Sequence, residues 1–201
     1  MIDVIRADRV EPQAWRNGGG LTRELLTWPS PSAGSPGSSG QDWQLRISMA
    51  EITRDGDFSA FDGIERWFAV VEGAGVLLRF ATHRSLLTPE GEPVSFDGAA
   101  PPHAELSEGA TLDLNLMIRR SAGRGGMRRA TIDDEWLTTA PLRALFVMQP
   151  ARLQIDDADA ARLPARSLAW SAHAGRQRWR VLADSETLLA HWLWFQPGAK
   201  S

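Results

Sequence analysis

Apolar and polar residues alternate in short runs along the chain, and this period predicts β-strands because successive side chains of a strand point to opposite faces. Residues 43–51 form one such run, in which Trp43, Leu45, Ile47 and Met49 oppose Gln44, Arg46, Ser48 and Ala50. Residues 111–120 form another, in which Leu112, Leu114, Leu116 and Ile118 oppose Asp113, Asn115, Met117 and Arg119. Both runs predict strands with one apolar and one polar face.

The rest of the pattern also favours strands. Residues 65–80 predict two strands around a glycine turn at Gly73 and Gly75. Further strands are expected in four segments, residues 142–150, 151–156, 177–184 and 188–197. Helix-like patches are confined to residues 133–138 and 156–162, and residues 121–129 have the glycine and arginine content of a loop. Many short strands separated by turns predict an all-β sandwich or barrel.

Two features bear on how these strands are organised. Residues 29–42 are rich in proline, serine and glycine, a composition that predicts an exposed loop without packed structure. The pair Arg66–Trp67 and the pair Arg178–Trp179 each precede a Leu-Leu pair at similar spacing. This weak internal repeat suggests two related β lobes.

Composition narrows the class of protein. Hydrophobic residues make up 43% of the 201 residues and the formal net charge is −3, so nothing favours a nucleic acid or an anionic membrane as partner. Cysteine is absent, which excludes disulfides and thiolate chemistry. The chain shows neither a signal-peptide pattern nor an apolar run of about 20 residues, so we expect a cytoplasmic protein.

The densest polar motif lies between Trp15 and Glu24, where Gly18, Gly19 and Gly20 follow one another. Successive glycines can turn their N–H groups toward an anion, or they can simply form a tight turn into a strand. The polar faces of the two alternating strands offer a second set: Arg46, Ser48, Asn115 and Arg119. Such a face either meets solvent or lines a barrel cavity, where arginine would pair with a carboxylate.

Two further observations concern candidate chemistry. Residues 56–66 place Phe58, Ser59 and Phe61 between glycines, which predicts either a pocket rim or a plug at a barrel end. The four histidines, His83, His103, His173 and His191, have no metal-ligand spacing and are expected at the surface or in loops. The sequence therefore predicts neither a metal site nor a cofactor.

Four segments in order carry a resemblance to a known family. They are WRNGGGLTRE, WQLRISMA, GDFSAFDGIER and DLNLMIRR. The chain resembles the HutD/Ves family over nearly its whole length, and the second half matches more weakly. The resemblance implies a double cupin (bicupin) with two β-barrel or jelly-roll lobes, here about residues 1–120 and 121–201. It also implies binding of a small acidic metabolite of histidine utilisation, such as N-formylglutamate or urocanate.

The resemblance also marks ligand-site positions in this chain. They are Asn17, Gly18, Gly19, Gly20, Thr22, Glu24, Arg46, Ser48, Phe58, Ser59, Phe61, Arg66, Asn115 and Arg119. Two departures stand out, the long insert at residues 29–40 and the pair Asp62–Gly63 where the family commonly has Pro-Gly. Neither touches the proposed polar set.

Three hypotheses follow. In the first, a regulatory, metal-independent protein binds the acid: Arg46 and Arg119 hold the carboxylate, Ser48 and Asn115 donate hydrogen bonds, and Phe58 or Phe61 covers the apolar part. In the second, a metal-free cupin isomerase or hydrolase uses Glu24 as general base, oriented by Thr22 and the glycine turn. In the third, an interaction module, such as a homodimer, uses the tryptophan-rich strand at Trp192 and Trp194, although a buried core strand explains that segment better.

Overall fold

The computed structural model describes residues 2–15, 18–29 and 43–198. Over these residues every regular element is a β-strand except the short 3-10 helix η1 (Ala7–Arg9), so the predicted all-β class is confirmed. Asn17 and nearly all of the predicted loop at residues 29–42 lie outside the described residues. No helix in the described ranges has the length and apolar character needed to cross a membrane.

The chain divides into two compact units. The N-terminal lobe consists of Glu11–Arg124 together with Gly198, and the C-terminal lobe consists of the segment up to Val10 and Gly125–Pro197. The sequence suggested lobes of about residues 1–120 and 121–201. The division instead assigns strand β1 (Asp3–Arg6) to the C-terminal lobe, where it pairs with the strand at Ser167–Ala172.

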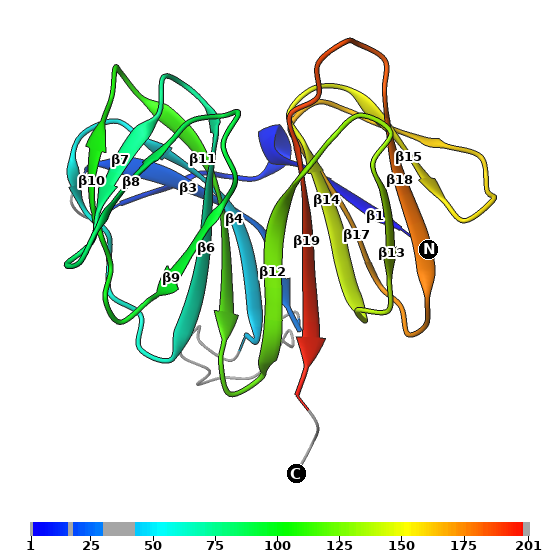
Figure 1. Cartoon of the computed structure of the whole chain (residues 1–201), viewed down its shortest axis with the longest axis horizontal. Helices are drawn as coiled ribbons and strands as arrows, with labels where there is room; N and C mark the ends of the chain where they lie inside the picture. The colour runs from blue at the N-terminus through cyan, green and yellow to red at the C-terminus, as the bar shows by residue number, and fades with distance from the viewer. Residues whose placement is uncertain (1, 16–17, 30–42, 199–201) are drawn as a thin grey trace. The chain divides into compact units, whose positions relative to one another are not determined.

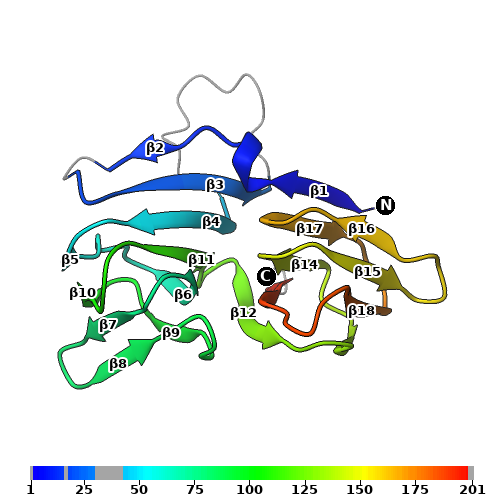
Figure 2. The same cartoon turned by 90° about the horizontal axis from the view of Figure 1, so that it is seen from above.

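The N-terminal lobe is built from two sheets (Figures 1 and 2). One has the order β2-β3-β4-β11-β6-β9 and the other the order β5-β10-β7-β8. The strands are β2 (Gln13–Ala14), β3 (Gly20–Trp28), β4 (Leu45–Ile52), β5 (Gly56–Asp57), β6 (Ile64–Glu72), β7 (Val76–Arg79), β8 (Arg84–Leu87), β9 (Val94–Asp97), β10 (His103–Leu106) and β11 (Thr111–Arg119). The alternating runs of the sequence are therefore β4 and β11, which pair antiparallel as neighbours.

Both sheets contribute to the core of this lobe. Ile52 and Phe68 from the larger sheet pack with Val76, Leu78 and Ala104 from the smaller one. Burial of apolar area is the main stabilising contribution to such a core. The residues between β5 and β6 close one side of it, because Phe58 belongs to the same buried cluster. A barrel interior results, and the inward face of each strand is fixed by its register.

The C-terminal lobe is also built from two sheets, but different side chains fill its core. Its sheets have the orders β1-β17-β14-β19-β12 and β13-β18-β15-β16. Its further strands are β12 (Gly123–Ala130), β13 (Glu135–Thr138), β14 (Leu142–Val147), β15 (Ala151–Ile155), β16 (Ala161–Leu163), β17 (Ser167–Ala172), β18 (Gln177–Ala183) and β19 (Ala190–Pro197). Trp136, Trp179 and Trp192 pack together, with ring centres 5.4 and 6.4 Å apart for the pairs Trp136–Trp192 and Trp179–Trp192. Indole rings thus pack together in the core of this lobe, beside smaller aliphatic side chains.

Three expectations about local structure were wrong. The helix-like patch at residues 133–138 contains strand β13, and the patch at residues 156–162 runs into strand β16. The expected loop at residues 121–129 is mostly strand β12. Glycine weakens a strand unless another group must come close, and an added β-carbon on Gly126 would lie 2.4 Å from the Trp194 ring. The glycine content of this segment therefore reflects close packing of a strand.

The tryptophan-rich C-terminal segment is a central strand, since β19 lies between β14 and β12. Trp192 and Leu193, which point to opposite faces, are both 0% exposed. Burial on both faces is what a core strand requires, and it confirms that interpretation of the segment.

We expect Gly20→Ala to destabilise the fold, because its new β-carbon would lie 2.1 Å from the carbonyl oxygen of Glu51 on β4. Two paired backbones would have to separate, at about 1–3 kcal/mol or more. Gly56→Ala is the matched control, since nothing lies within 4 Å of its added carbon. Urea unfolding of the two variants checks this, and equal midpoints would contradict it.

Candidate functional site

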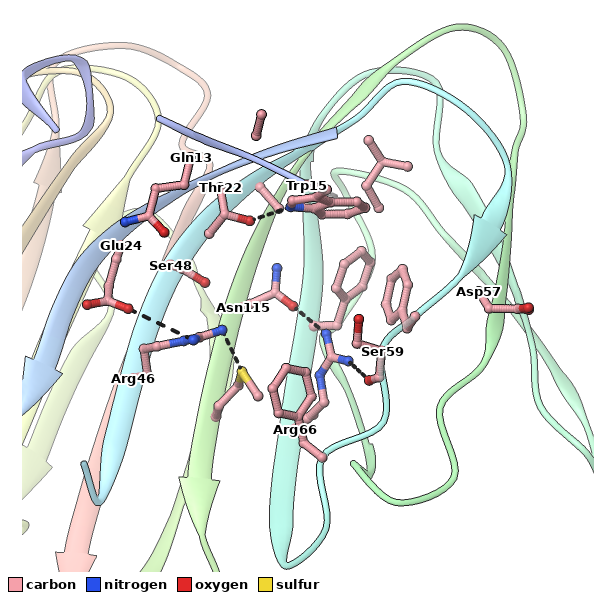
Figure 3. A pocket seen from close by; sticks show the side chains of 17 residues that line it. Gln13, Trp15, Thr22, Glu24, Arg46, Ser48, Asp57, Ser59, Arg66 and Asn115 are labelled. Atoms are coloured by element: carbon pink, nitrogen blue, oxygen red, sulfur yellow. Dashed lines mark hydrogen bonds and ion pairs between the residues drawn. The ribbon is translucent and has the colours of Figure 1, made fainter. Parts of the chain in front are cut away.

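A cavity of about 430 Å³ lies inside the N-terminal lobe. Its walls include the polar faces of β4 and β11, since Arg46, Ser48, Asn115 and Met117 all line it (Figure 3). The registers explain this arrangement: Ser48 pairs with Asn115, Arg46 pairs with Met117, and directly paired residues share a face. The polar face that the sequence left open between solvent and a cavity therefore lines a cavity.

The neighbouring strand β6 adds its own inward face. Arg66 pairs with Met117 and Phe68 pairs with Asn115, and both Arg66 and Phe68 line the cavity. The interior is therefore layered across β4, β11 and β6. One layer holds Arg46, Met117 and Arg66, and the next holds Ser48, Asn115 and Phe68.

Arg66 is the most unusual group in the cavity. Its side chain is buried, at 7% exposure, and its hydrogen bonds go only to neutral oxygens. Nη2 donates to Asn115 Oδ1 at 3.2 Å and Nη1 donates to the Ser59 carbonyl at 3.4 Å. Nε is buried and has no partner, and no carboxylate in the described ranges forms an ion pair with this guanidinium.

Aromatic rings surround the same guanidinium. Its central carbon lies 4.9 Å from the ring centre of Phe58, 5.7 Å from that of Phe61 and 5.1 Å from that of Phe96. Ring faces stabilise a cation, but each contributes only about 0.5–2 kcal/mol. Burial, with the nearby charge of Arg46, lowers the pKa of Arg66 to about 10. The guanidinium is still charged at neutral pH and lacks an anion.

Arg46 has a different environment. Its Nη1 lies 3.9 Å from Glu24 Oε2, and its Nη2 donates to the sulfur of Met117 at 3.2 Å. Burial lowers the pKa of Arg46, and the Glu24 charge opposes this effect. A distance of 3.9 Å is too long for a hydrogen bond, so the pair is loose. Arg46 is therefore partly neutralised, whereas Arg66 is not.

Asn115 has a fixed orientation. A guanidinium can only donate, so the oxygen of the Asn115 amide must face Arg66 and its NH₂ group must face elsewhere. Figure 3 shows that nitrogen turned away from Arg66. The amide can therefore donate to a ligand that Arg66 also contacts.

A β-bulge in β3 brings Thr27 onto the same face as Glu24. The register of β3 with β4 shifts between Glu24 and Leu26, so that Glu24 pairs with Ser48 and Thr27 pairs with Arg46. Both therefore share the inward face, and Thr27 Oγ1 donates to Glu24 Oε1 at 2.7 Å. The contact with Glu24 that was expected from Thr22 is therefore made by Thr27, and the Thr22 hydroxyl accepts a hydrogen bond from Trp15 Nε1 at 2.7 Å.

The glycine run forms a turn. Trp15 N–H donates to the Gly20 carbonyl and Gly18 N–H donates to the Trp15 carbonyl, which closes the connection between β2 and β3. Gly18 has a φ of +67°, a region that favours glycine. None of Gly18, Gly19 and Gly20 lines the cavity. Their effect is indirect, because the turn returns Gln13 and Trp15 to the cavity wall.

Arg119 also lies outside the cavity wall. It ends β11, its Nε donates to the Trp43 carbonyl at 3.2 Å, and its guanidinium lies 5.6 Å from the Trp43 ring centre. The second arginine of the cavity is Arg66, so the expected pairing of Arg46 with Arg119 is wrong. The predicted positions that do line the cavity are Thr22, Glu24, Arg46, Ser48, Phe58, Ser59, Phe61, Arg66 and Asn115.

Sequence reasoning missed Gln13, Trp15, Phe68 and Met117 as wall residues. Met117 stood on the polar face of a recognised strand, and the alternation alone could have identified it. Gln13 belongs to the two-residue strand β2, which is too short to give a periodic signal. Asp57 is a wall residue whose side chain turns away from the cavity in Figure 3. Its Oδ1 lies 2.7 Å from His103 Nδ1.

The histidines are dispersed. His83 and His173 are exposed, as expected, but His191 is 0% exposed in β19, so its predicted surface position is wrong. Burial, with the charge of Arg129, lowers the pKa of His191 to about 4, which makes it neutral at physiological pH. In the described ranges no three His, Cys, Asp or Glu side chains gather as metal ligands would.

Comparisons with known proteins agree on the fold. Protein Ves of Citrobacter koseri is 32% identical over 187 residues, which cover 92% of this chain and 90% of that protein. The structure of HutD from Pseudomonas fluorescens SBW25, in a formate condition, matches with a TM-score of 0.81 at 22% identity over 99% of this chain and all of its own. An oxalate decarboxylase from Bacillus subtilis matches with a TM-score of 0.58 at 10% identity, covering 96% of this chain and 76% of its own.

These matches confirm the double-cupin fold, since the more distant neighbours are cupins. The model of the HutD family matches residues 7–189, which is most of the chain. The protein therefore belongs to the HutD family.

Proposed function

We propose that the cavity of the N-terminal lobe binds a small carboxylic acid, with Arg66 as its main anchor. The observation that carries this proposal is the buried guanidinium of Arg66, which has no anionic partner among the described residues. A buried charge without a counter-ion is costly, and a carboxylate supplies both the charge and the acceptor atoms that this group lacks. A volume of about 430 Å³ suits a small molecule.

The wall residues suggest how such an acid would lie. Its carboxylate would meet Arg66 and the NH₂ group of Asn115, whose direction the Arg66 hydrogen bond fixes. Phe58 and Phe61 would cover the apolar part, and Ser48 and Arg46 would contact a second polar group. Compared with the sequence hypothesis, Arg66 replaces Arg119 as the second arginine.

The family provides the biological context. HutD proteins are associated with histidine utilisation, so the ligand we propose is an acid of that pathway, such as N-formylglutamate or urocanate. A binding protein of this kind would act as a regulator that senses the metabolite.

Catalysis is the alternative function of the same cavity, and Glu24 is its candidate base, because the other acidic wall residue, Asp57, pairs with His103. Its side chain is 44% exposed, it accepts from Thr27, and it faces Arg46. A carboxylate in that position serves better as an internal counter-ion, which an incoming acid would displace. The geometry therefore favours binding over turnover.

We expect Arg66→Met to weaken acid binding by roughly 10- to 100-fold, the range for losing hydrogen bonds to a charged group. Calorimetric titration with N-formylglutamate, urocanate and glutamate measures this. Arg119→Gln is the matched control, because it removes an arginine outside the cavity wall and should leave affinity nearly unchanged.

Arg66→Met should also melt at or above the wild-type temperature in the absence of ligand. Replacing a buried charge by an apolar side chain of similar length is often neutral or stabilising. A folded wild-type protein that gives no binding heat with any of the three acids would refute the proposed function. Equal losses in Arg66→Met and Arg119→Gln would refute the assigned anchor.

We expect Glu24→Gln to bind the acid about 2- to 5-fold more tightly, because Arg46 loses a competing carboxylate and a partly exposed ion pair is worth up to about 1 kcal/mol. The same titration measures the change. Incubation of the wild type with each acid, followed by NMR, tests the alternative: turnover that disappears in Glu24→Gln would establish an enzyme.

A further inference from the structure

A further ionisable group, Asp113, lies inside the barrel, one layer from Asn115. Asp113 on β11 pairs with Ala50 on β4 and with Val70 on β6. Ala50 lines the cavity and Val70 belongs to the buried core of the lobe, so Asp113 shares the inward face. Its side chain is 0% exposed. The layer beside it contains Asn115, which contacts Arg66.

Asp113 has little to stabilise a negative charge. Thr111 Oγ1 donates to its Oδ2 at 3.0 Å, and its Oδ1 is buried without a hydrogen-bond partner. No cation in the described residues forms an ion pair with it. An ionised carboxylate taken out of water and left with one hydroxyl donor is strongly unfavourable.

The groups that face Asp113 from neighbouring strands are neutral. On β4 they are Ser48, Ala50 and Ile52, and on β6 they are Phe68 and Val70. The smaller sheet contributes the apolar residues Val76, Leu78 and Ala104 to the same core. The nearest charged side chain by register is Glu24 on β3, which pairs with Ser48 in the adjacent layer and is 44% exposed. The arginines Arg46 and Arg66 lie two layers away along β11. Burial therefore raises the pKa of Asp113 well above its ordinary value of 3.8, and the Thr111 hydrogen bond opposes this only in part.

We propose that Asp113 is a neutral carboxylic acid that keeps the barrel interior positive for an anionic ligand, and that loss of its proton weakens ligand binding. This inference rests on the proposed acid binding and adds its regulation by pH. Layers along a strand are separated by about 7 Å, because each residue rises about 3.4 Å. A ligand carboxylate at Asn115 and an ionised Asp113 would thus be close like charges inside a barrel.

The size of the effect follows from that separation. Two like charges about 7–10 Å apart at an effective dielectric constant of about 20 repel enough to change affinity about 10-fold or more. The sign of the pH effect on affinity follows from the charge of Asp113, which is neutral below its pKa and negative above it. Below the folded pKa of Asp113 the acid binds fully, and above it the affinity falls.

The test is a titration of N-formylglutamate into the wild type and into Asp113→Asn from about pH 5 up to the alkaline limit at which both proteins stay folded, a range in which an ordinary carboxylate ligand stays ionised. Asparagine keeps the shape of a neutral carboxylic acid. We expect the wild-type affinity to fall about 10-fold or more with rising pH, and the Asp113→Asn affinity to stay level. Deprotonation of Arg66 at high pH would lower the affinity of both proteins alike. It therefore cancels in the ratio of the wild-type affinity to the Asp113→Asn affinity at each pH. Identical pH profiles would overturn the proposal.

A second variant guards against misfolding of the first. Thr111→Val removes the hydroxyl that stabilises the ionised form, so the pH at which affinity falls should rise. An unchanged or lower transition pH in Thr111→Val would count against Asp113 as the titrating group.

A readout without ligand separates this inference from the proposed function. Infrared spectra of the wild type at neutral pH should show a protonated-carboxyl band that Asp113→Asn lacks. If this band is present and no acid binds, the proposed function fails while the neutral Asp113 stands. If acid binds and the band is absent, the inference alone fails.

Discussion

The buried positive charge of Arg66 has no counter-ion among the described residues, and the rest of the N-terminal lobe must offset its cost. Arg66 is surrounded by three phenylalanine rings and two neutral oxygens, none of which carries a full negative charge. Other strands must therefore supply the stability that this charge opposes, and the apolar core formed by both sheets of the lobe does so. A neutral Asp113 fits the same constraint, because an ionised one would remove the positive interior that makes the cavity attractive to an acid. The ligand, in this view, completes an electrostatic arrangement that the protein leaves unfinished.

Much of the fold and part of the site could be predicted from the sequence. The period of two in residues 43–51 and 111–120 determines which residues share a face, so Arg46, Ser48 and Asn115 were correctly grouped. It could not say which face is inside, because both faces of β4 and β11 are largely buried. The bulge between Glu24 and Leu26 has no sequence signal, and it decides that Thr27 contacts Glu24. Arg119 was misplaced because it ends its strand, where its long side chain turns back to the Trp43 carbonyl.

The weak internal repeat has a structural explanation. In the N-terminal lobe Arg66 faces the cavity, whereas in the C-terminal lobe Trp179 faces the core and Arg178 pairs with Asp157 at the surface. A shift of one residue along a strand exchanges its two faces. The similar Arg-Trp pairs are thus used with opposite faces inward. One lobe thereby presents an arginine to a cavity, and the other packs an indole into its hydrophobic core.

The position of Trp15 on the cavity wall gives the protein an optical property. The chain contains 9 tryptophans and no tyrosine, so indole rings dominate its near-ultraviolet emission. Trp15 lines the cavity with its N–H group already donated to Thr22, whereas Trp179 and Trp192 are fully buried in the core of the C-terminal lobe. An occupant of the cavity would alter the polarity beside Trp15 and leave those two rings in the same surroundings. The emission of the unlabelled protein thus combines one indole that borders the cavity with others that serve as an internal reference.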